Sequence, residues 1–257
     1  MNELKKIKLS DAHIESWPLT LQEAVLRQND FCLAVEPERK LCDQCDYLDF
    51  IDNRLVYFSV EYGSMSFDFN ELKSYHERQK YAFTKEPLYR ALGLKGKLAE
   101  QKKSIWDTTC GTGKDSVLIH HFGASLTSFE RHPIVYLLLQ DALRRFPLLD
   151  FELIFRSANF YDGKLSSPEV IYFDPMYPSK KKSALPRKEM LIFKELVGED
   201  LDAGDFLEWA LSKALERVVV KRPLEAPPLK PNPTASYSGK STRYDMYKIF
   251  SHRPASF

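Results

Sequence analysis

From Ser104 onward, segments that favour strands alternate with segments that favour helices, and this alternation constrains the fold more than any other feature of the chain. The predicted strands are short apolar or β-branched runs: Ser104–Thr108, Ser125–Glu130, Phe151–Phe155, Glu169–Phe173 and Arg217–Lys221. The predicted helices lie between them: Lys114–Phe122, Pro133–Arg145, Pro186–Val197 and Gly204–Leu215. Such alternation predicts an α/β fold with a parallel sheet and helices on both of its faces.

The first part of the chain has a different pattern. Between residues 30 and 70, β-branched or aromatic runs are separated by turn residues, which predicts a small mixed sheet. The predicted strands are Phe31–Val35, Tyr47–Ile51, Leu55–Val60 and Met65–Phe69. We therefore predict a small β-rich N-terminal domain over residues 1–71 and a larger α/β domain over residues 72–257.

Composition excludes several classes of protein. Apolar residues make up 44% and charged residues 28% of the 257 residues, as in ordinary globular proteins. The longest apolar run, Ile134–Leu139, is too short to span a membrane, and the N-terminus lacks the apolar stretch of a signal peptide. We therefore expect a cytoplasmic protein without membrane spans. Cys42 and Cys45 form a CxxC pair without the second pair that a structural zinc site needs, so no metal site is expected.

The turn after the first predicted strand is a candidate ligand site. Asp107 lies at the end of that strand, and Gly111 and Gly113 precede the helix that begins at Lys114. Two glycines allow positive φ angles and a close approach of the backbone, so that amide groups at the helix N-terminus can face a ligand. Ser116 stands where a dinucleotide fingerprint has its third glycine. By itself the turn could serve a purely structural purpose.

Two further segments narrow the choice of ligand. Glu130 ends the next predicted strand, where a carboxylate can accept hydrogen bonds from both ribose hydroxyls of NAD or of S-adenosylmethionine (SAM). The sequence Asp174-Pro175-Met176-Tyr177-Pro178 follows the strand predicted over Glu169–Phe173. Ligands of open α/β sheets bind outside the carboxyl ends of the strands, so this loop should face the same crevice. An Asp-Pro-x-aromatic loop at that place is typical of methyltransferases that act on amino groups, which favours SAM.

We assign the chemistry to Asp174, Pro175 and Tyr177. The Asp174 carboxylate can accept a hydrogen bond from an exocyclic amino group, Pro175 makes the turn rigid, and the Tyr177 ring can stack on a base. An amine conjugated to a purine ring is a poor nucleophile. Catalysis would therefore depend on holding the nitrogen in line with the methyl group and on accepting charge as its proton leaves.

These segments resemble the small-subunit ribosomal RNA methyltransferase J family. The resemblance runs from about Leu55 to Phe250 and is densest from Asp107 to Pro223. Besides the segments above, it is carried by Lys182–Leu185, Lys188–Met190, Leu196–Gly198, Asp200–Asp202 and Val218–Pro223. It implies a Rossmann-like SAM-dependent methyltransferase, an enzyme that transfers a methyl group to the exocyclic amino group of a guanine in small-subunit (16S) ribosomal RNA.

The resemblance also implies which residues bind the cofactor. Together with the turn, the set expected to bind SAM is Asp107, Gly111, Gly113, Lys114, Asp115, Glu130, Arg131, Ala158, Asn159 and Asp174. Thr109 stands where many SAM enzymes have a glycine, although Asp-x-Thr-x-Gly-x-Gly-x-Asp is the form that the resemblance assigns to this family. The paired serines of the family near Ala158 are not matched, so that contact could be made by the backbone or shifted by a residue.

RNA binding has to be a local property, because 37 Lys and Arg oppose 36 Asp and Glu. From residue 180 to residue 194 there are six basic residues against one acidic residue, and a second basic cluster runs from Arg217 to Arg243. A lysine run is usually only a solvated surface, but this one follows the predicted catalytic loop and so favours phosphate contacts. The residues predicted to bind ribosomal RNA or the small ribosomal subunit are Lys180, Lys181, Lys182, Arg187, Lys188, Lys221 and Arg222.

Two other hypotheses remain open from the sequence. The same fold and cofactor could serve an adenine, a DNA base or a protein amide as acceptor. Alternatively, the chain could be a non-catalytic RNA-binding assembly factor with a vestigial SAM pocket, although the intact Asp107, Glu130 and Asp174 argue against such decay. No residue indicates the oligomeric state.

Overall fold

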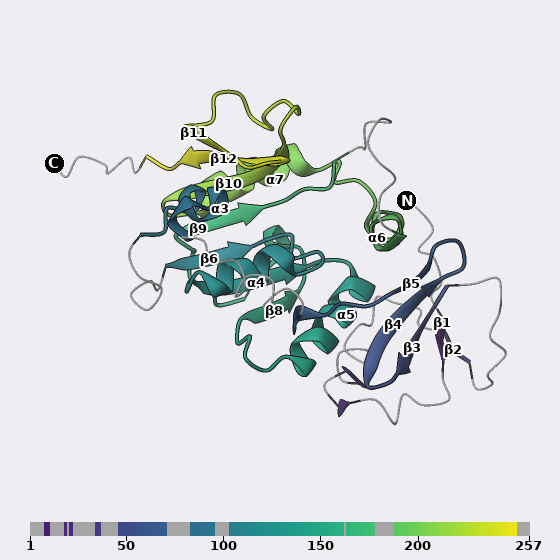
Figure 1. The fold of residues 1–257 in the computed structure, drawn as a ribbon. Helices are drawn as coiled ribbons and strands as arrows, with labels where there is room; N and C mark the ends of the chain where they lie inside the picture. The colour runs from purple at the N-terminus through teal and green to yellow at the C-terminus, as the bar shows by residue number, and fades with distance from the viewer. Residues whose placement is uncertain are drawn as a thin grey trace. The chain divides into compact units, whose positions relative to one another are not determined.

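A computed structural model gives the fold shown in Figure 1. It describes residues 8–10, 18–19, 21–22, 34–36, 46–70, 83–95, 103–161, 163–177 and 188–250. The chain divides into two compact units. One comprises residues 1–70, 132–148 and 178–198, and the other comprises residues 71–131, 149–177 and 199–257. The first unit thus includes two segments from later in the chain, and the domain boundary between residues 71 and 72 stays a prediction.

The larger unit contains a seven-stranded sheet in the order β11-β12-β10-β9-β6-β7-β8. Its strands are β6 (Ser104–Asp107), β7 (Ser125–Glu130), β8 (Glu152–Phe155), β9 (Val170–Phe173), β10 (Arg217–Pro223), β11 (Ala235–Ser238) and β12 (Thr242–Lys248). The five strands predicted from the sequence are present and parallel to one another.

Two antiparallel strands extend the predicted parallel sheet at one edge. β12 pairs antiparallel with β10, and β11 pairs antiparallel with β12. Only residues 239–241 separate β11 from β12, and a connection this short joins antiparallel neighbours, because a parallel pair needs a crossover of a dozen or more residues. The sheet is therefore mixed.

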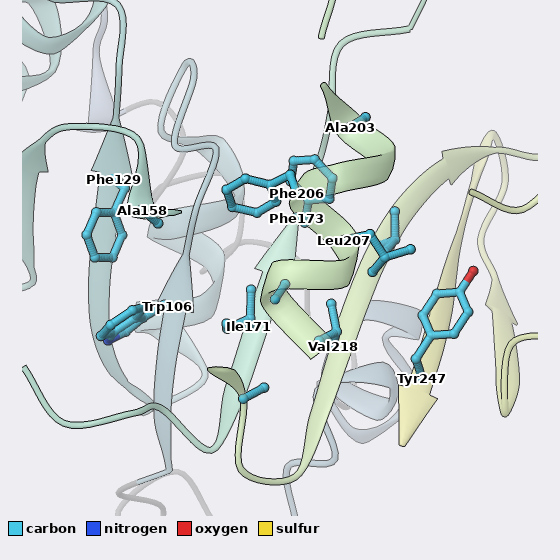
Figure 2. Close-up of a cluster of buried hydrophobic side chains, with 13 residues drawn as sticks. Trp106, Phe129, Ala158, Ile171, Phe173, Ala203, Phe206, Leu207, Val218 and Tyr247 are labelled. Atoms are coloured by element: carbon cyan, nitrogen blue, oxygen red, sulfur yellow. The ribbon is translucent and has the colours of Figure 1, made fainter. Parts of the chain in front are cut away.

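Helices cover both faces of this sheet. The described helices of the larger unit are α3 (Pro87–Ala91), α4 (Lys114–His121) and α7 (Ala203–Lys213), with short 3₁₀ turns at Phe83–Lys85 and Ala158–Phe160. On β9, Ile171 and Phe173 belong to the apolar cluster that contains α7 residues (Figure 2). Tyr172 lies between them on the opposite face, because successive strand residues alternate, and its hydroxyl contacts α4.

The apolar cluster under α7 anchors the strands that carry the site. Phe173 of β9 and Phe206 of α7 pack on each other (Figure 2), and their ring centroids are 4.5 Å apart. Trp106 of β6 and Phe129 of β7 pack at 5.0 Å in the same cluster. Each of the three acidic residues of the site directly follows a residue of this core: Asp107 follows Trp106, Glu130 follows Phe129 and Asp174 follows Phe173. The core therefore fixes the strand ends from which these acidic residues project.

The smaller unit contains the predicted mixed sheet, in the order β2-β1-β3-β4-β5. Its strands are β1 (Lys8–Ser10), β2 (Ala34–Glu36), β3 (Tyr47–Ile51), β4 (Arg54–Ser59) and β5 (Gly63–Met65). β1 runs parallel to β2 and β3, whereas β3, β4 and β5 are antiparallel. Asp52 and Asn53 both have positive φ angles, as the tight hairpin between β3 and β4 requires.

Two later helices, α5 (Pro133–Arg145) and α6 (Lys188–Val197), also belong to the smaller unit. α5 packs on β4 through Asp141, which is fully buried. Its carboxylate accepts a hydrogen bond of 3.0 Å from the Leu55 amide and forms ion pairs of 2.9 Å with Arg144 and with Arg145. Arg144 also donates to the carbonyl of Asn53, and Arg145 donates to that of Phe67. Asp141 therefore links the sheet to α5.

Among the described helices, none is long and apolar enough to cross a membrane. The described residues also contain no group of His, Cys, Asp and Glu side chains that could hold a metal ion. The predicted thiol pair, Cys42 and Cys45, lies outside the described residues.

Candidate active site

The turn after β6 is held by a buried carboxylate. Asp107 has no exposed surface, and its oxygens accept hydrogen bonds from the Thr109 amide at 3.1 Å and from the Ser116 hydroxyl at 2.5 Å. Ser116 also lies 2.9 Å from the hydroxyl oxygen of Ser128 on β7. Burial raises the pKa of Asp107 to about 7, although the Ser116 hydrogen bond favours the charged form. Asp107 therefore ties the turn to the start of α4.

The two glycines adopt the conformation expected of them. Gly111 and Gly113 have φ angles of 57° and 76°, a region that other residues rarely adopt. Gly113 is the N-cap of α4, and no side chain caps that helix. The first turn of α4 therefore presents backbone N–H groups and the positive end of the helix dipole at the carboxyl edge of the sheet.

Glu130, at the end of β7, lies against this turn. Its side chain is almost wholly buried, and Oε2 accepts a hydrogen bond of 3.0 Å from the Gly111 amide. The structure thus brings Glu130 and the glycine turn together. Ala158 and Asn159 form the turn after the neighbouring strand β8, where Ala158 is buried and the Ser157 hydroxyl donates to Asn159 Oδ1 at 2.6 Å.

Two threonines join the glycine turn to β9 and to the loop that follows it. The Thr108 hydroxyl donates to the carbonyl of Tyr172 at 2.8 Å. The Asp174 amide donates to Thr109 Oγ1 at 2.7 Å. The loop beginning at Asp174 is therefore fixed to the same turn that Glu130 contacts, and Thr109 has this role at the position where many SAM enzymes have glycine.

Lys221 lies between two acidic side chains of the site. Its ammonium nitrogen is 2.7 Å from Asp115 Oδ2 and 2.9 Å from Asp174 Oδ2. The Tyr172 hydroxyl donates to the same Asp115 oxygen at 2.5 Å. Burial raises the pKa of Asp174 to about 6; Lys221 opposes this increase and Asp115 adds to it. The structure therefore brings together residues that were predicted separately for cofactor, acceptor and RNA.

A second contact, which sequence reasoning missed, braces the Asp174 loop. Asp200 Oδ2 accepts a hydrogen bond of 2.7 Å from the Met176 amide, and the Asp200 amide donates to the Met176 carbonyl at 3.3 Å. Arg131 forms ion pairs with Asp200 and, at 3.2 Å, with Asp202. Arg131 thus supports the loop through Asp200. The only sign of this contact in the sequence is the pair of acidic residues on either side of Leu201, Asp200 and Asp202.

Tyr177 is held by Arg222. The Arg222 guanidinium carbon lies 3.6 Å from the Tyr177 ring centroid, and Nε and Nη2 donate to the Pro227 carbonyl at 2.9 and 2.5 Å. Arg222 is only 5% exposed, and burial raises the pKa of Tyr177. One face of the Tyr177 ring is therefore covered by a cation.

The basic residues predicted to bind RNA fall into different environments. Lys221 and Arg222 contact groups within the protein, whereas Lys188 is exposed on α6. Lys180, Lys181, Lys182 and Arg187 lie outside the described residues.

Comparisons with known proteins found relatives of this chain. Residues 51–249 match the family model described as a putative SAM-dependent methyltransferase. A ribosomal RNA small subunit methyltransferase J from Coxiella burnetii is 42% identical over 73% of this chain and 76% of its own length. That from Bdellovibrio bacteriovorus is 40% identical over 78% of this chain and 81% of its own length. The crystal structure of a SAM-dependent methyltransferase from Neisseria gonorrhoeae superposes with a TM-score of 0.67 at 27% identity, covering 98% of this chain and 99% of that one.

Proposed function

Because the chain belongs to the family of SAM-dependent methyltransferases that includes ribosomal RNA small subunit methyltransferase J, we propose that it methylates the exocyclic amino group of a guanine in small-subunit (16S) ribosomal RNA. The observation that best supports an amino acceptor is the Asp174–Tyr177 loop. It leaves the carboxyl end of β9 and is hydrogen bonded through Thr109 to the glycine turn. Acceptor and cofactor groups would thus meet at one edge of the sheet.

The residues present fit SAM, whose sulfonium carries the methyl group to be transferred. The N-terminus of α4 offers N–H groups to a carboxylate, and Glu130 offers a carboxylate to ribose hydroxyls. We propose that the cofactor contacts are made by Gly111, Gly113, Lys114, Asp115, Glu130, Arg131, Ala158, Asn159 and Asp174, with Asp107 holding the turn.

On the acceptor side, Asp174 would accept a hydrogen bond from the guanine amino group and take up the proton that this group loses when it is methylated. Pro175 is buried and restricts the loop. Tyr177 would stack on a base that is turned out of the RNA, with Arg222 keeping the ring in place from its other face.

The cofactor assignment predicts a loss of affinity in Glu130→Ala. Replacing the carboxylate removes the proposed ribose contact and the bond to the Gly111 amide, so SAM binding should weaken by about 1–3 kcal/mol. Isothermal titration calorimetry measures this, with the exposed Glu152 on the neighbouring β8 replaced by Ala as the control. SAM affinity equal to that of the wild type, or tight binding of NAD, would contradict the assignment.

We further propose that Lys180, Lys181, Lys182, Arg187 and Lys188 contact RNA phosphates. Each phosphate contact on single-stranded RNA contributes about 0.7 to the slope of log affinity against log salt concentration. Replacing Lys180, Lys181 and Lys182 by Ala should therefore flatten the slope by up to about 2 without changing SAM affinity. Filter binding of the small ribosomal subunit at three salt concentrations measures the slope. Replacement of the exposed Lys85 and Lys95 serves as control, and an unchanged slope in the triple variant refutes the assignment.

A transfer assay decides between this function and its alternatives. Small subunits from cells that lack the protein are incubated with it and with SAM labelled in the methyl group. We expect the label in N2-methylguanosine of the ribosomal RNA. Label in an adenine or in a ribosomal protein would identify a different acceptor, and RNA binding without transfer would indicate an assembly factor. A cytoplasmic location, where ribosomal subunits assemble, is part of the proposal.

A further inference from the structure

Lys221 joins residues predicted to bind the cofactor to the predicted acceptor loop, although its place in a basic cluster suggested a contact with RNA. It lies on β10 beyond Val220, which pairs with Phe173 of β9, so its side chain is beside the residue that follows Phe173, namely Asp174. By strand alternation it points to the same face as Val219 and toward α4, where it contacts Asp115. One ammonium group thus joins α4, β10 and the Asp174 loop.

The groups around this ammonium are mostly acidic. Asp115 from α4 and Asp174 from the loop contact it directly, and Tyr172 shares Asp115 Oδ2. Tyr244 of β12 is paired with Lys221 in the sheet register. Asp200 raises the pKa of Asp174 electrostatically, and Asp115 and Asp174 in the same way raise that of Asp107. The carboxylates therefore repel one another unless a cation separates them.

We propose that Lys221 is a positioning residue for methyl transfer, which holds the Asp174 carboxylate charged and oriented toward α4 and does not contact RNA phosphate. This inference rests on the proposed role of Asp174 as acceptor of the amino proton. Lys221 is only 22% exposed at its side chain and has two carboxylate partners, an environment that leaves its charge committed within the protein.

The sign of the effect follows from the neighbours of Asp174. A cation within 4–6 Å lowers the pKa of a carboxylic acid by about 1–3 units, and a nearby carboxylate raises it. Burial already raises the pKa of Asp174 to about 6 with Lys221 present. Loss of the ammonium leaves Asp115 beside Asp174 without a counter-ion, so the pKa of Asp174 rises further. The proposed methyl transfer requires the charged carboxylate. When the pH is lowered, its rate therefore begins to fall at a higher pH than in the wild type.

The direct test is the titration of Asp174 in the protein without cofactor. Carbon NMR of aspartate-labelled protein gives its pKa, with the signal assigned by its disappearance in Asp174→Asn. Lys221→Met should raise the pKa of Asp174 by about 1 unit or more, and Lys221→Arg should leave it near the wild-type value. The acid limb of the methylation rate should move by the same amount in Lys221→Met, with SAM affinity measured in parallel.

Lys103→Met is the matched control. Lys103 is also half-buried and paired with a carboxylate, Glu216, at 2.5 Å, but it precedes β6 at the amino edge of the sheet. The Lys103→Met variant should be less stable than the wild type, but the pKa of Asp174 should stay the same. If Lys221→Met does not fold, Lys221→Gln repeats the comparison with an uncharged donor and the same expected shift.

The outcomes separate the two claims. An Asp174 pKa that stays unchanged without the Lys221 charge, or a raised pKa with an unmoved acid limb, overturns the role of Lys221. A wild-type protein that transfers no methyl group to any guanine contradicts the proposed function, whereas the NMR titration still reports on Lys221.

Discussion

Asp174→Ala should lower the rate of methyl transfer by about 10²- to 10³-fold or more, the loss typical of removing one preorganised polar group that stabilises developing charge. The substitution removes the carboxylate that lies at the end of β9 and takes an ion pair from Lys221. Thr109 contacts only the backbone amide of residue 174, so the loop itself should keep its place.

Single-turnover transfer at saturating SAM measures this effect, and calorimetry measures cofactor binding separately. Asp174→Asn keeps the shape of the side chain and should restore little activity, because an amide accepts no proton. Replacement of the exposed Asp205 in the first turn of α7 by Ala is the control and should leave the rate unchanged. A transfer rate within a few-fold of wild type in Asp174→Ala would remove the central residue from the proposed chemistry.

Asp141→Ala should destabilise the smaller unit by about 3–5 kcal/mol, the cost of removing one partner from a buried ion pair. The carboxylate is fully buried between Arg144, Arg145 and the Leu55 amide. Its loss leaves two guanidinium groups and a strand amide without their acceptor. Both arginines also bind carbonyls of the β3–β4 hairpin and of Phe67, so the packing of β4 on α5 should weaken as a whole.

Urea unfolding followed by circular dichroism gives this free energy. Asp150→Ala is the control, because Asp150 is 88% exposed where it contacts His120 and should contribute little. A midpoint for Asp141→Ala that matches the control would show that the arginines find other acceptors.

The sequence pattern predicted the limits of an element correctly where one face of the element is apolar and a particular residue marks its start. β7 and α5 have the predicted limits, the second because Pro133 begins the helix and an apolar stripe follows it. The remaining predicted strands and helices of the larger unit shift by one or two residues. Burial does not mark the ends of these elements, because the turns that follow the strands are as buried as the strands themselves.

The edge of the sheet could not be predicted in the same way. β12 contains Arg243 and Asp245 beside its apolar and aromatic residues Tyr244, Met246 and Tyr247, yet Asp245 is fully buried. The structure explains this burial, because Asp245 accepts hydrogen bonds from Arg243 at 2.9 Å and from Ser236 of β11 at 2.6 Å. A pattern of single residues cannot show that two charged side chains neutralise each other.

The site was predictable at the strand ends and not in its cross-links. Asp107, Glu130 and Asp174 could be named because each lies at the carboxyl end of a buried strand, where open α/β sheets place their ligands. The partners of Lys221 are far from it in sequence and become its neighbours only through the strand order β9-β10 and the packing of α4. Charge clustering along the chain instead suggested RNA.

The most direct measurement of the central claim is a map of methylated guanines in 16S ribosomal RNA. RNA from cells with and without the gene for this protein is digested and analysed by mass spectrometry. We predict that one N2-methylguanosine disappears with the gene and returns when the wild-type protein, but not Asp174→Ala, is supplied. Identical N2-methylguanosine in all of these RNAs would contradict the account.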